Sequence, residues 1–360
     1  MADLILIPVV LLILYKIEYK KDGIYEDYLS IERSNILKAI MAFIVMLSHC
    51  TLSYLNINTF FLKFLSGGDA VKIFFFLSGF GLAYSCRKKA GYLNNFFSRR
   101  LSKLLVPVIL VAILNVIFFK YTGTFYDTDG ITVKNVFTSF FNNGYTIVFN
   151  LWYVVELIVL YIGFYFSFKL SKNDFNKGIN YSVAFTVVVM LAFYLVFIYK
   201  GWLAVWFYST YAFAFGLIWG AKDEEIKEFA KHKSNYMFSI LLSAFAILML
   251  IVVNLKSSLE TGNYDIIKNL ILGPVVILGI VIAGMKIKVN CKFWKVMGSI
   301  SYEIYLVHGI FINLLRGNKI YIQNDFLYVL CVVVLSVLTA FILNYLSKMI
   351  IKPINKSKAR

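Results

Sequence analysis

The sequence predicts an all-α protein, a polytopic transmembrane bundle of about ten or eleven helices. Of its 360 residues, 60% are apolar and only 15% are charged, whereas soluble domains carry about 25% charged residues. Apolar runs recur along the chain with short polar segments between them. Lysine and arginine concentrate in alternate polar segments, which is typical of cytoplasmic loops.

Each apolar run approaches the length of about 20 residues that a helix needs to cross the hydrocarbon layer. The runs are too long and continuous for the strands of a membrane barrel, the other structure that satisfies its backbone in lipid. The first candidate is short and weak. The candidate spans are 4–16, 36–54, 70–85, 104–119, 151–168, 182–199, 202–219, 237–255, 268–285, 298–315 and 326–347.

These runs predict a single membrane domain with short flanking segments. Residues 1–35 hold a weak N-terminal apolar segment and a cytoplasmic loop, 36–350 form the membrane domain, and 351–360 form a basic cytoplasmic tail. No linker rich in proline, glycine or serine divides the chain, which has only four prolines.

The distribution of charge predicts the orientation of the helices. Segment 86–103 contains six basic residues and no acidic one, so we expect it in the cytoplasm. Alternating the spans from there puts 26 lysines and arginines on the cytoplasmic side and eight on the outer side. The net charge of +17 therefore reflects membrane orientation, and we expect no nucleic-acid partner. The prediction from charge is a multi-pass membrane protein with a cytoplasmic C-terminus.

Ionisable side chains inside the predicted spans are candidates for function, because each costs at least about 2.5–3.5 kcal/mol to insert. Lys72 is expected to snorkel outward, and His232, in a basic loop, is expected to be solvated. Glu156 lies about one turn inside the outer interface, where it would orient a ligand or pair with a buried cation. The six groups are Lys38, His49, Lys72, Glu156, Glu303 and His308.

Lys38 and His49 are predicted to share one face of a single helix. Eleven steps of about 100° return to within about 20° of the start and rise about 16 Å. Only Ala42 and Val45 lie on the stripe between them. The spacing suits a cation near the cytoplasmic mouth and an imidazole deeper in the membrane. The alternative is a histidine bonded to a backbone carbonyl and a lysine that reaches the headgroups.

A second polar face is predicted around His308. Ser301, Tyr305 and His308 fall at helical positions i, i+4 and i+7, so they point to one side, whereas Glu303 points to another. Such a face lines a ligand cavity or joins helices by hydrogen bonds.

Small residues in segment 74–85 predict close packing of helices. Gly79 and Gly81 would allow a neighbouring backbone to approach. The four cysteines form no CxxC pair and have no histidine at metal-ligand spacing, so we expect free thiols and no metal site.

A basic cluster lies just before the predicted span 104–119. Arg100 and Lys103 are three residues apart and therefore neighbours on a helix, with Arg99 beside them. They would hold phosphate groups or would serve only to orient the helix.

Five segments, in this order, resemble motifs of the acyltransferase 3 family of bacterial membrane O-acyltransferases, and the resemblance covers about 33–350. Lys103 stands where the family has arginine, which keeps the charge but loses the bidentate fork. The segments are Lys38-x10-His49, Phe74-Phe-Phe-Leu-Ser-Gly-Phe80, Arg99-Arg-Leu-Ser-Lys103 with Pro107, Trp152-x3-Glu156-x4-Tyr161 and Ile300-Ser-Tyr-x-Ile-Tyr-Leu-x-His308.

The resemblance implies that acyl-CoA, usually acetyl-CoA, is a co-substrate and that no cofactor is bound permanently. The implied acceptor is a hydroxyl of a cell-surface polysaccharide, its lipid-linked precursor or a glycolipid. His49 is the implied catalytic residue, assisted by Lys38, and Arg99, Arg100 and Lys103 would bind the donor. The implied residues on the acceptor side are Ser78, Glu156, Ser301, Tyr302, Tyr305 and His308. The alternative class is a transporter or flippase of lipid-linked sugars or exopolysaccharide that uses the same polar path.

Overall fold

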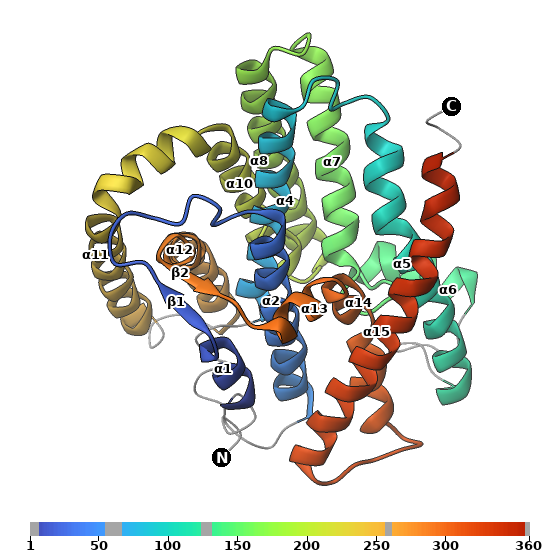
Figure 1. The fold of residues 1–360 in the computed structure, drawn as a ribbon. Coiled ribbons are helices and arrows are strands. Elements are labelled where there is room, and N and C mark those ends of the chain that lie inside the picture. The colour runs from blue at the N-terminus through green and yellow to red at the C-terminus, as the bar shows by residue number, and fades with distance from the viewer. Residues whose placement is uncertain (1–6, 55–66, 124–131, 256–260, 357–360) are drawn as a thin grey trace.

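The computed structural model describes residues 7–54, 67–123, 132–255 and 261–356. These residues form a bundle of α-helices with one short two-stranded sheet (Figure 1). The elements are α1 (Ile7–Leu14), β1 (Ile17–Tyr19), α2 (Ile31–Tyr54), α4 (Gly67–Lys88), α5 (Phe96–Thr122), α6 (Val133–Asn143), α7 (Trp152–Leu170), α8 (Phe175–Lys200), α9 (Val205–Tyr208), α10 (Tyr211–Ala221), α11 (Asp223–Leu255), α12 (Thr261–Lys286), β2 (Ile287–Val289), α13 (Lys292–Gly298), α14 (Ser301–Leu315) and α15 (Asp325–Lys356).

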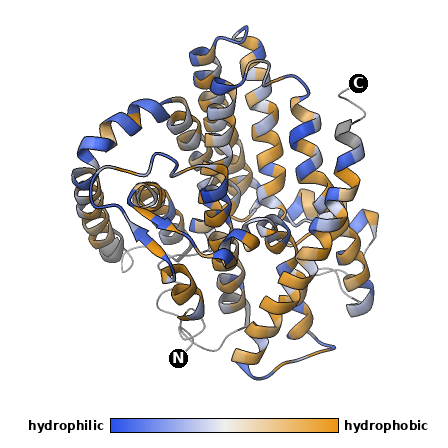
Figure 2. Cartoon of the chain, in the orientation of Figure 1, coloured by the Kyte–Doolittle hydropathy of each residue, from blue (hydrophilic) through white to orange (hydrophobic). Residues whose placement is uncertain are grey.

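Eight of the described helices are long and apolar enough to cross a membrane, namely α2, α4, α5, α7, α8, α11, α12 and α15. Figure 2 shows apolar helix shafts with hydrophilic residues gathered in the connections between them. The predicted all-α polytopic bundle is therefore confirmed.

Three predicted spans differ from a single long helix. Of 4–16, the described part forms α1, whose eight residues span only about 12 Å. Residues 4–6 lie outside the described part. The predicted span 202–219 is broken at Ser209 and Thr210 into α9 and α10, and Thr210 Oγ1 lies 3.0 Å from the Phe207 carbonyl oxygen at the break.

The predicted span 298–315 is mainly α14, a short helix in the interior of the bundle. Its 15 residues reach about 22 Å, less than the roughly 30 Å of hydrocarbon. Helices α2, α5 and α15 contact it, and most of its side chains are buried. A polar face on α14 is therefore presented to protein and not to lipid.

Helices α4 and α10 approach so closely that only glycine fits at the contact. A Cβ on Gly216 would lie 2.0 Å from the carbonyl oxygen of Phe76, and one on Gly79 would lie 2.2 Å from that of Phe213. Gly79 is therefore a packing glycine, as predicted. Gly81 is not, because a Cβ there would meet no atom within 4 Å.

Four of the segments predicted to be cytoplasmic contact one another, namely 16–35, 86–103, 220–236 and 286–297. Antiparallel pairing of β1 with β2 joins the 16–35 segment to the 286–297 segment. Ion pairs tie these segments together, and they are Lys295–Glu32 at 2.7 Å, Lys88–Glu224 at 2.9 Å and Lys231–Glu26 at 3.3 Å. The alternation of basic segments thus agrees with the arrangement of the helix ends.

Candidate functional site

Two histidines that are 259 residues apart in the sequence touch inside the bundle. Nδ1 of His49, on α2, lies 2.9 Å from Nε2 of His308, on α14. The two rings are nearly coplanar and lie edge to edge, with an interplanar angle of 3° and centroids 5.2 Å apart. His308 is fully buried and His49 is half-buried. The two polar faces predicted separately from the sequence therefore meet at this histidine pair.

The hydrogen bonds of the pair assign the proton on each ring. His308 Nδ1 lies 3.1 Å from the Ile304 carbonyl oxygen, which only accepts, so this nitrogen carries a proton. In a neutral His308 ring, Nε2 is then an acceptor, and His49 Nδ1–H is its donor. The remaining nitrogen, His49 Nε2, keeps an unprotonated lone pair and has no hydrogen-bond partner among the described residues. The arrangement prepares His49 Nε2 to accept a proton.

Asn150 and Phe149 complete the surroundings of the pair, and neither was singled out from the sequence. Asn150 Nδ2 lies 3.3 Å from His49 Nδ1 and 3.4 Å from His308 Nε2. The Phe149 ring stands edge-on to His49 at a centroid distance of 5.6 Å. Asn150 adopts a positive φ of 60° just before α7, a conformation that asparagine tolerates. That tolerance was the only local signal for this residue.

Helix α2 places Lys38 and His49 on one stripe, as the spacing predicts, because it runs unbroken from Ile31 to Tyr54. Ala42 and Val45, which lie between them, are completely buried. Lys38 is half-buried, and Arg100 at the start of α5 lies within electrostatic range of it. A second cation from another helix therefore joins the Lys38 end of the stripe.

The three basic residues of α5 have different surroundings. Arg100 is half-buried, bonds the Tyr92 hydroxyl and lies 5.9 Å from the centre of the Tyr161 ring. Arg99 is exposed and donates hydrogen bonds to the carbonyls of Tyr92 and Asn94, so it also stabilises the preceding loop. Lys103 is exposed. Their binding of a donor stays a prediction, and Arg100 is the best placed toward Lys38.

Glu156 is completely buried on α7 and is not ion-paired to a cation among the described residues. Its Oε1 accepts a hydrogen bond from Thr210 at the break between α9 and α10. Its Oε2 has no hydrogen-bond partner within the described residues. The sequence left two interpretations of Glu156 open, namely that it orients a ligand or that it pairs with a buried cation. The described residues contain no such ion pair.

Lys72 does not snorkel, and that expectation is wrong. Its side chain is completely buried, and Nζ lies 2.7 Å from Asp69 Oδ1 and 2.6 Å from Asn269 Oδ1. Gly273 on α12 makes room, since a Cβ there would lie 3.0 Å from this ammonium. The ion pair with Asp69 thus lies within α4, and the hydrogen bond to Asn269 joins α4 to α12.

The polar face of α14 is used mainly to hold neighbouring segments. Tyr305 donates a hydrogen bond to the Asn150 carbonyl at 2.8 Å, and Tyr302 donates one to the Leu104 carbonyl of α5 at 3.0 Å. Ser301 bonds the Gly298 carbonyl one turn back. Tyr305 therefore fixes the backbone that presents Asn150 to the histidines.

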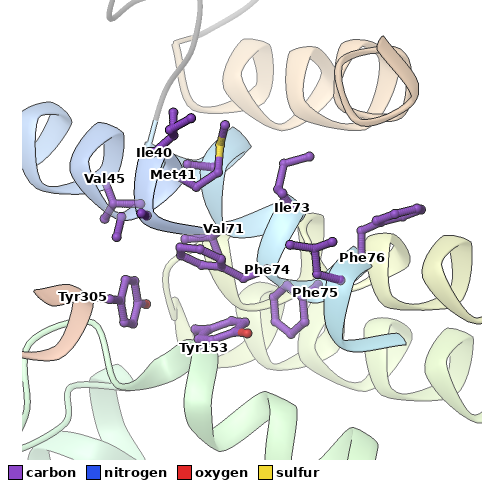
Figure 3. Packing of buried hydrophobic residues seen from close by; sticks show 14 of the residues in the cluster. Ile40, Met41, Val45, Val71, Ile73, Phe74, Phe75, Phe76, Tyr153 and Tyr305 are labelled. Atoms are coloured by element: carbon purple, nitrogen blue, oxygen red, sulfur yellow. The ribbon is translucent and has the colours of Figure 1, made fainter. Parts of the chain in front are cut away.

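An aromatic cluster supports this arrangement from the α4 side. Phe74, Tyr153 and Tyr305 contact one another with ring centroids 5.6–5.9 Å apart (Figure 3). Ser78, one helical turn from Phe74, interacts with the hydroxyls of Tyr153 and Tyr161. Segment 74–80 therefore lies beside the site, and Glu303 points away from it, toward Asn344 on α15 at 2.9 Å.

Comparison with known proteins agrees with this arrangement. A family model described as an acyltransferase domain, that of the acyltransferase 3 family, matches residues 31–345, nearly the whole chain. Neither a search of curated proteins nor a search of solved structures found a match. The matched region contains the unbroken α2 with His49, the α4–α10 contact and α14 with His308. The chain therefore belongs to the acyltransferase 3 family and is a multi-pass membrane acyltransferase.

Proposed function

We propose that this acyltransferase moves an acyl group, most simply acetyl, from acyl-CoA to a hydroxyl of a cell-surface polysaccharide, its lipid-linked precursor or a glycolipid. We place it in the bacterial plasma membrane with its C-terminus in the cytoplasm. The contact between His49 and His308 carries this proposal, because it gives one imidazole nitrogen a fixed lone pair inside a membrane bundle.

In the proposed reaction His49 is the general base. The acceptor hydroxyl oxygen attacks the thioester carbonyl carbon while His49 Nε2 takes the hydroxyl proton. The tetrahedral intermediate then collapses, the C–S bond breaks, and His49 returns the proton to the CoA thiolate. The products are an acyl ester and CoA. General base catalysis of this kind contributes about 10²–10⁴-fold to the rate.

His308 is proposed as the positioning residue for His49. When His49 becomes an imidazolium, its Nδ1–H bond to His308 Nε2 becomes charge-assisted, and such bonds are roughly twice as strong as neutral ones. The pair thus stabilises the charge that appears only in the transition state. Asn150 Nδ2, a donor, lies 3.4 Å from His308 Nε2 and can share that acceptor with His49.

The donor is proposed to enter from the end of the bundle that carries Lys38 and Arg100. Arg100 offers a guanidinium that suits a phosphate oxygen, and Lys38 lies on the same stripe as His49. An extended acyl-CoA would place its phosphates at these cations and its thioester toward the imidazole. Arg99 and Lys103 would add charge at the entrance, and Ser78 would contribute to the wall formed by α4.

The acceptor is proposed to bind beside α7 and α14. Glu156 offers a carboxylate oxygen that has no hydrogen-bond partner among the described residues, which suits a sugar hydroxyl. Ser301, Tyr302 and Tyr305 would shape this side through α14.

Transfer of ¹⁴C-acetyl from labelled acetyl-CoA to isolated surface polysaccharide and glycolipid tests the proposal. Purified wild-type protein should label the acceptor, and His49→Ala should lower the rate about 10²–10⁴-fold. His232→Ala is the matched control, because that histidine is exposed on α11 and should leave the rate unchanged. Full activity of a well-folded His49→Ala protein would contradict the assignment of the base.

A further inference from the structure

A basic pocket lies away from the histidine pair, at the end of the bundle that holds the predicted cytoplasmic segments. It lies between the loop after β1, residues 229–236 of α11 and the end of α12, and has a volume of about 800 Å³. Figure 1 shows this loop running alongside the start of α11. The charged groups and the histidine that line the pocket are Lys21, Asp22, Lys231, His232, Lys233 and Lys286.

The described side chains do not balance the positive charge of this pocket. Lys286 is only 5% exposed, and its Nζ donates to the Lys21 carbonyl at 3.1 Å. Within the described part of the chain, no carboxylate pairs with Lys286, Lys21 or Lys233. Lys231 is paired, with Glu26 and Glu228.

The pocket contains one acidic residue, Asp22, which forms no ion pair among the described residues. A buried ammonium without a counter-ion is costly. Lys286 therefore favours the binding of an anion, because no described carboxylate pairs with it.

The exposure of α11 and of two aromatic residues indicates that the pocket lies near the membrane surface. Helix α11 is the most lipid-exposed of the eight candidate spans, with only 6% of its apolar window buried. Phe229 and Tyr236 line the pocket and are 56% and 64% exposed. Exposed aromatic residues at the end of a spanning helix are typical of the headgroup region. Figure 2 shows the start of α11 as hydrophilic, in keeping with that level.

We propose that this pocket binds the phosphate group of an anionic phospholipid headgroup from the leaflet on the predicted cytoplasmic side. Lysine ammonium groups bind phosphate oxygens by charge-assisted hydrogen bonds. Basic pockets beside spanning helices on the cytoplasmic side bind anionic headgroups in this way. A free phosphate ion carries the same group, but the lipid exposure of α11 favours the headgroup. The inference concerns a site separate from the acyl-transfer site and does not depend on the acyl donor or acceptor.

Native mass spectrometry of the full-length protein in neutral detergent tests the proposal. Short-chain phosphatidylglycerol is titrated, with short-chain phosphatidylcholine and inorganic phosphate as parallel arms. Each lysine near a membrane surface contributes to anionic lipid binding to an extent that corresponds to roughly fivefold in affinity. Lys286→Met should therefore weaken phosphatidylglycerol binding roughly fivefold or more.

Because Lys286 is buried, its substitution can also destabilise the fold, so a second variant that changes exposed residues is needed. Lys21→Gln combined with Lys233→Gln changes only exposed side chains and should weaken binding by about 25-fold. Lys177→Gln is the matched control, since Lys177 is exposed near the same end of the bundle and does not line the pocket.

Selective binding of phosphatidylglycerol that the pocket variants weaken and Lys177→Gln does not would support the proposal. Three results would overturn it. They are equal binding of phosphatidylcholine, an equal loss in Lys177→Gln, and unchanged binding in the double variant. Binding of inorganic phosphate as tight as that of phosphatidylglycerol would reassign the pocket to a soluble phosphate ligand and overturn the lipid assignment.

Discussion

Substitutions of His308 should separate a positioning role from a merely structural one. A glutamine can place its amide oxygen near the position of His308 Nε2, where it can accept the His49 Nδ1–H. An asparagine is shorter and reaches only the Nδ1 position, from which it can donate to the Ile304 carbonyl. The two variants thus keep opposite halves of the hydrogen-bond chain, and only glutamine keeps the acceptor for His49.

The expected effect follows from the single bond that is lost. A neutral hydrogen bond contributes about 0.5–1.5 kcal/mol and one to a charged group about 1.5–3 kcal/mol. When His49 becomes charged, its hydrogen bond to His308 therefore becomes stronger by about 1–2 kcal/mol. This difference in transition-state stabilisation corresponds to roughly 5- to 30-fold in rate. We expect kcat to fall by that factor in His308→Asn and by at most about threefold in His308→Gln. KM for the donor should stay unchanged, because the bond matters most in the transition state.

Steady-state release of CoA gives kcat and KM, and ¹⁵N-histidine NMR reports the tautomer directly. The chain has three histidines, so a His232→Gln background leaves only the interacting pair in the spectrum. Wild-type His49 should appear as the Nδ1–H tautomer, and His308→Asn should lose this preference. Equal kcat values for the glutamine and asparagine variants would refute the reasoning, as would a wild-type His49 protonated at Nε2.

Three further substitutions and one control, Gly81→Ala, test the packing that holds the site, each by the thermal-unfolding midpoint in detergent. Gly216→Ala should destabilise the protein by about 1–3 kcal/mol, whereas Gly81→Ala, where a Cβ meets no atom within 4 Å, should leave the midpoint unchanged. Gly309→Ala should lower both the midpoint and kcat, because its Cβ would lie 2.4 Å from the Phe149 ring beside the histidines. Lys72→Met should cost about 3–5 kcal/mol, since it removes the cation of a buried ion pair. An unchanged midpoint in Lys72→Met would contradict the internal ion pair.

The short length of α14 has a consequence for how the site is built. A helix that crossed the whole membrane would present part of its surface to lipid, where a histidine is costly. With α2, α5 and α15 around it, α14 can carry His308 completely buried. The interior position thus supplies a dry environment in which one hydrogen bond can decide the tautomer.

The sequence by itself determined the features that depend on local periodicity and composition. Runs of apolar residues set the long helices, and alternating basic segments set which helix ends lie together. The eleven-residue step from Lys38 to His49 placed both on one stripe, because an unbroken helix has a fixed rotation per residue.

The tertiary structure alone decided which polar groups meet. The approach of His49 to His308, the position of Asn150 beside them and the burial of Lys72 depend on how separate helices pack. No local pattern encodes a contact between residues 259 positions apart. Gly79 and Gly81 look alike in sequence, yet only Gly79 faces another backbone. Side-chain proximity across a bundle is set by the simultaneous packing of all the helices, and a single stretch of sequence contains only one of the surfaces involved.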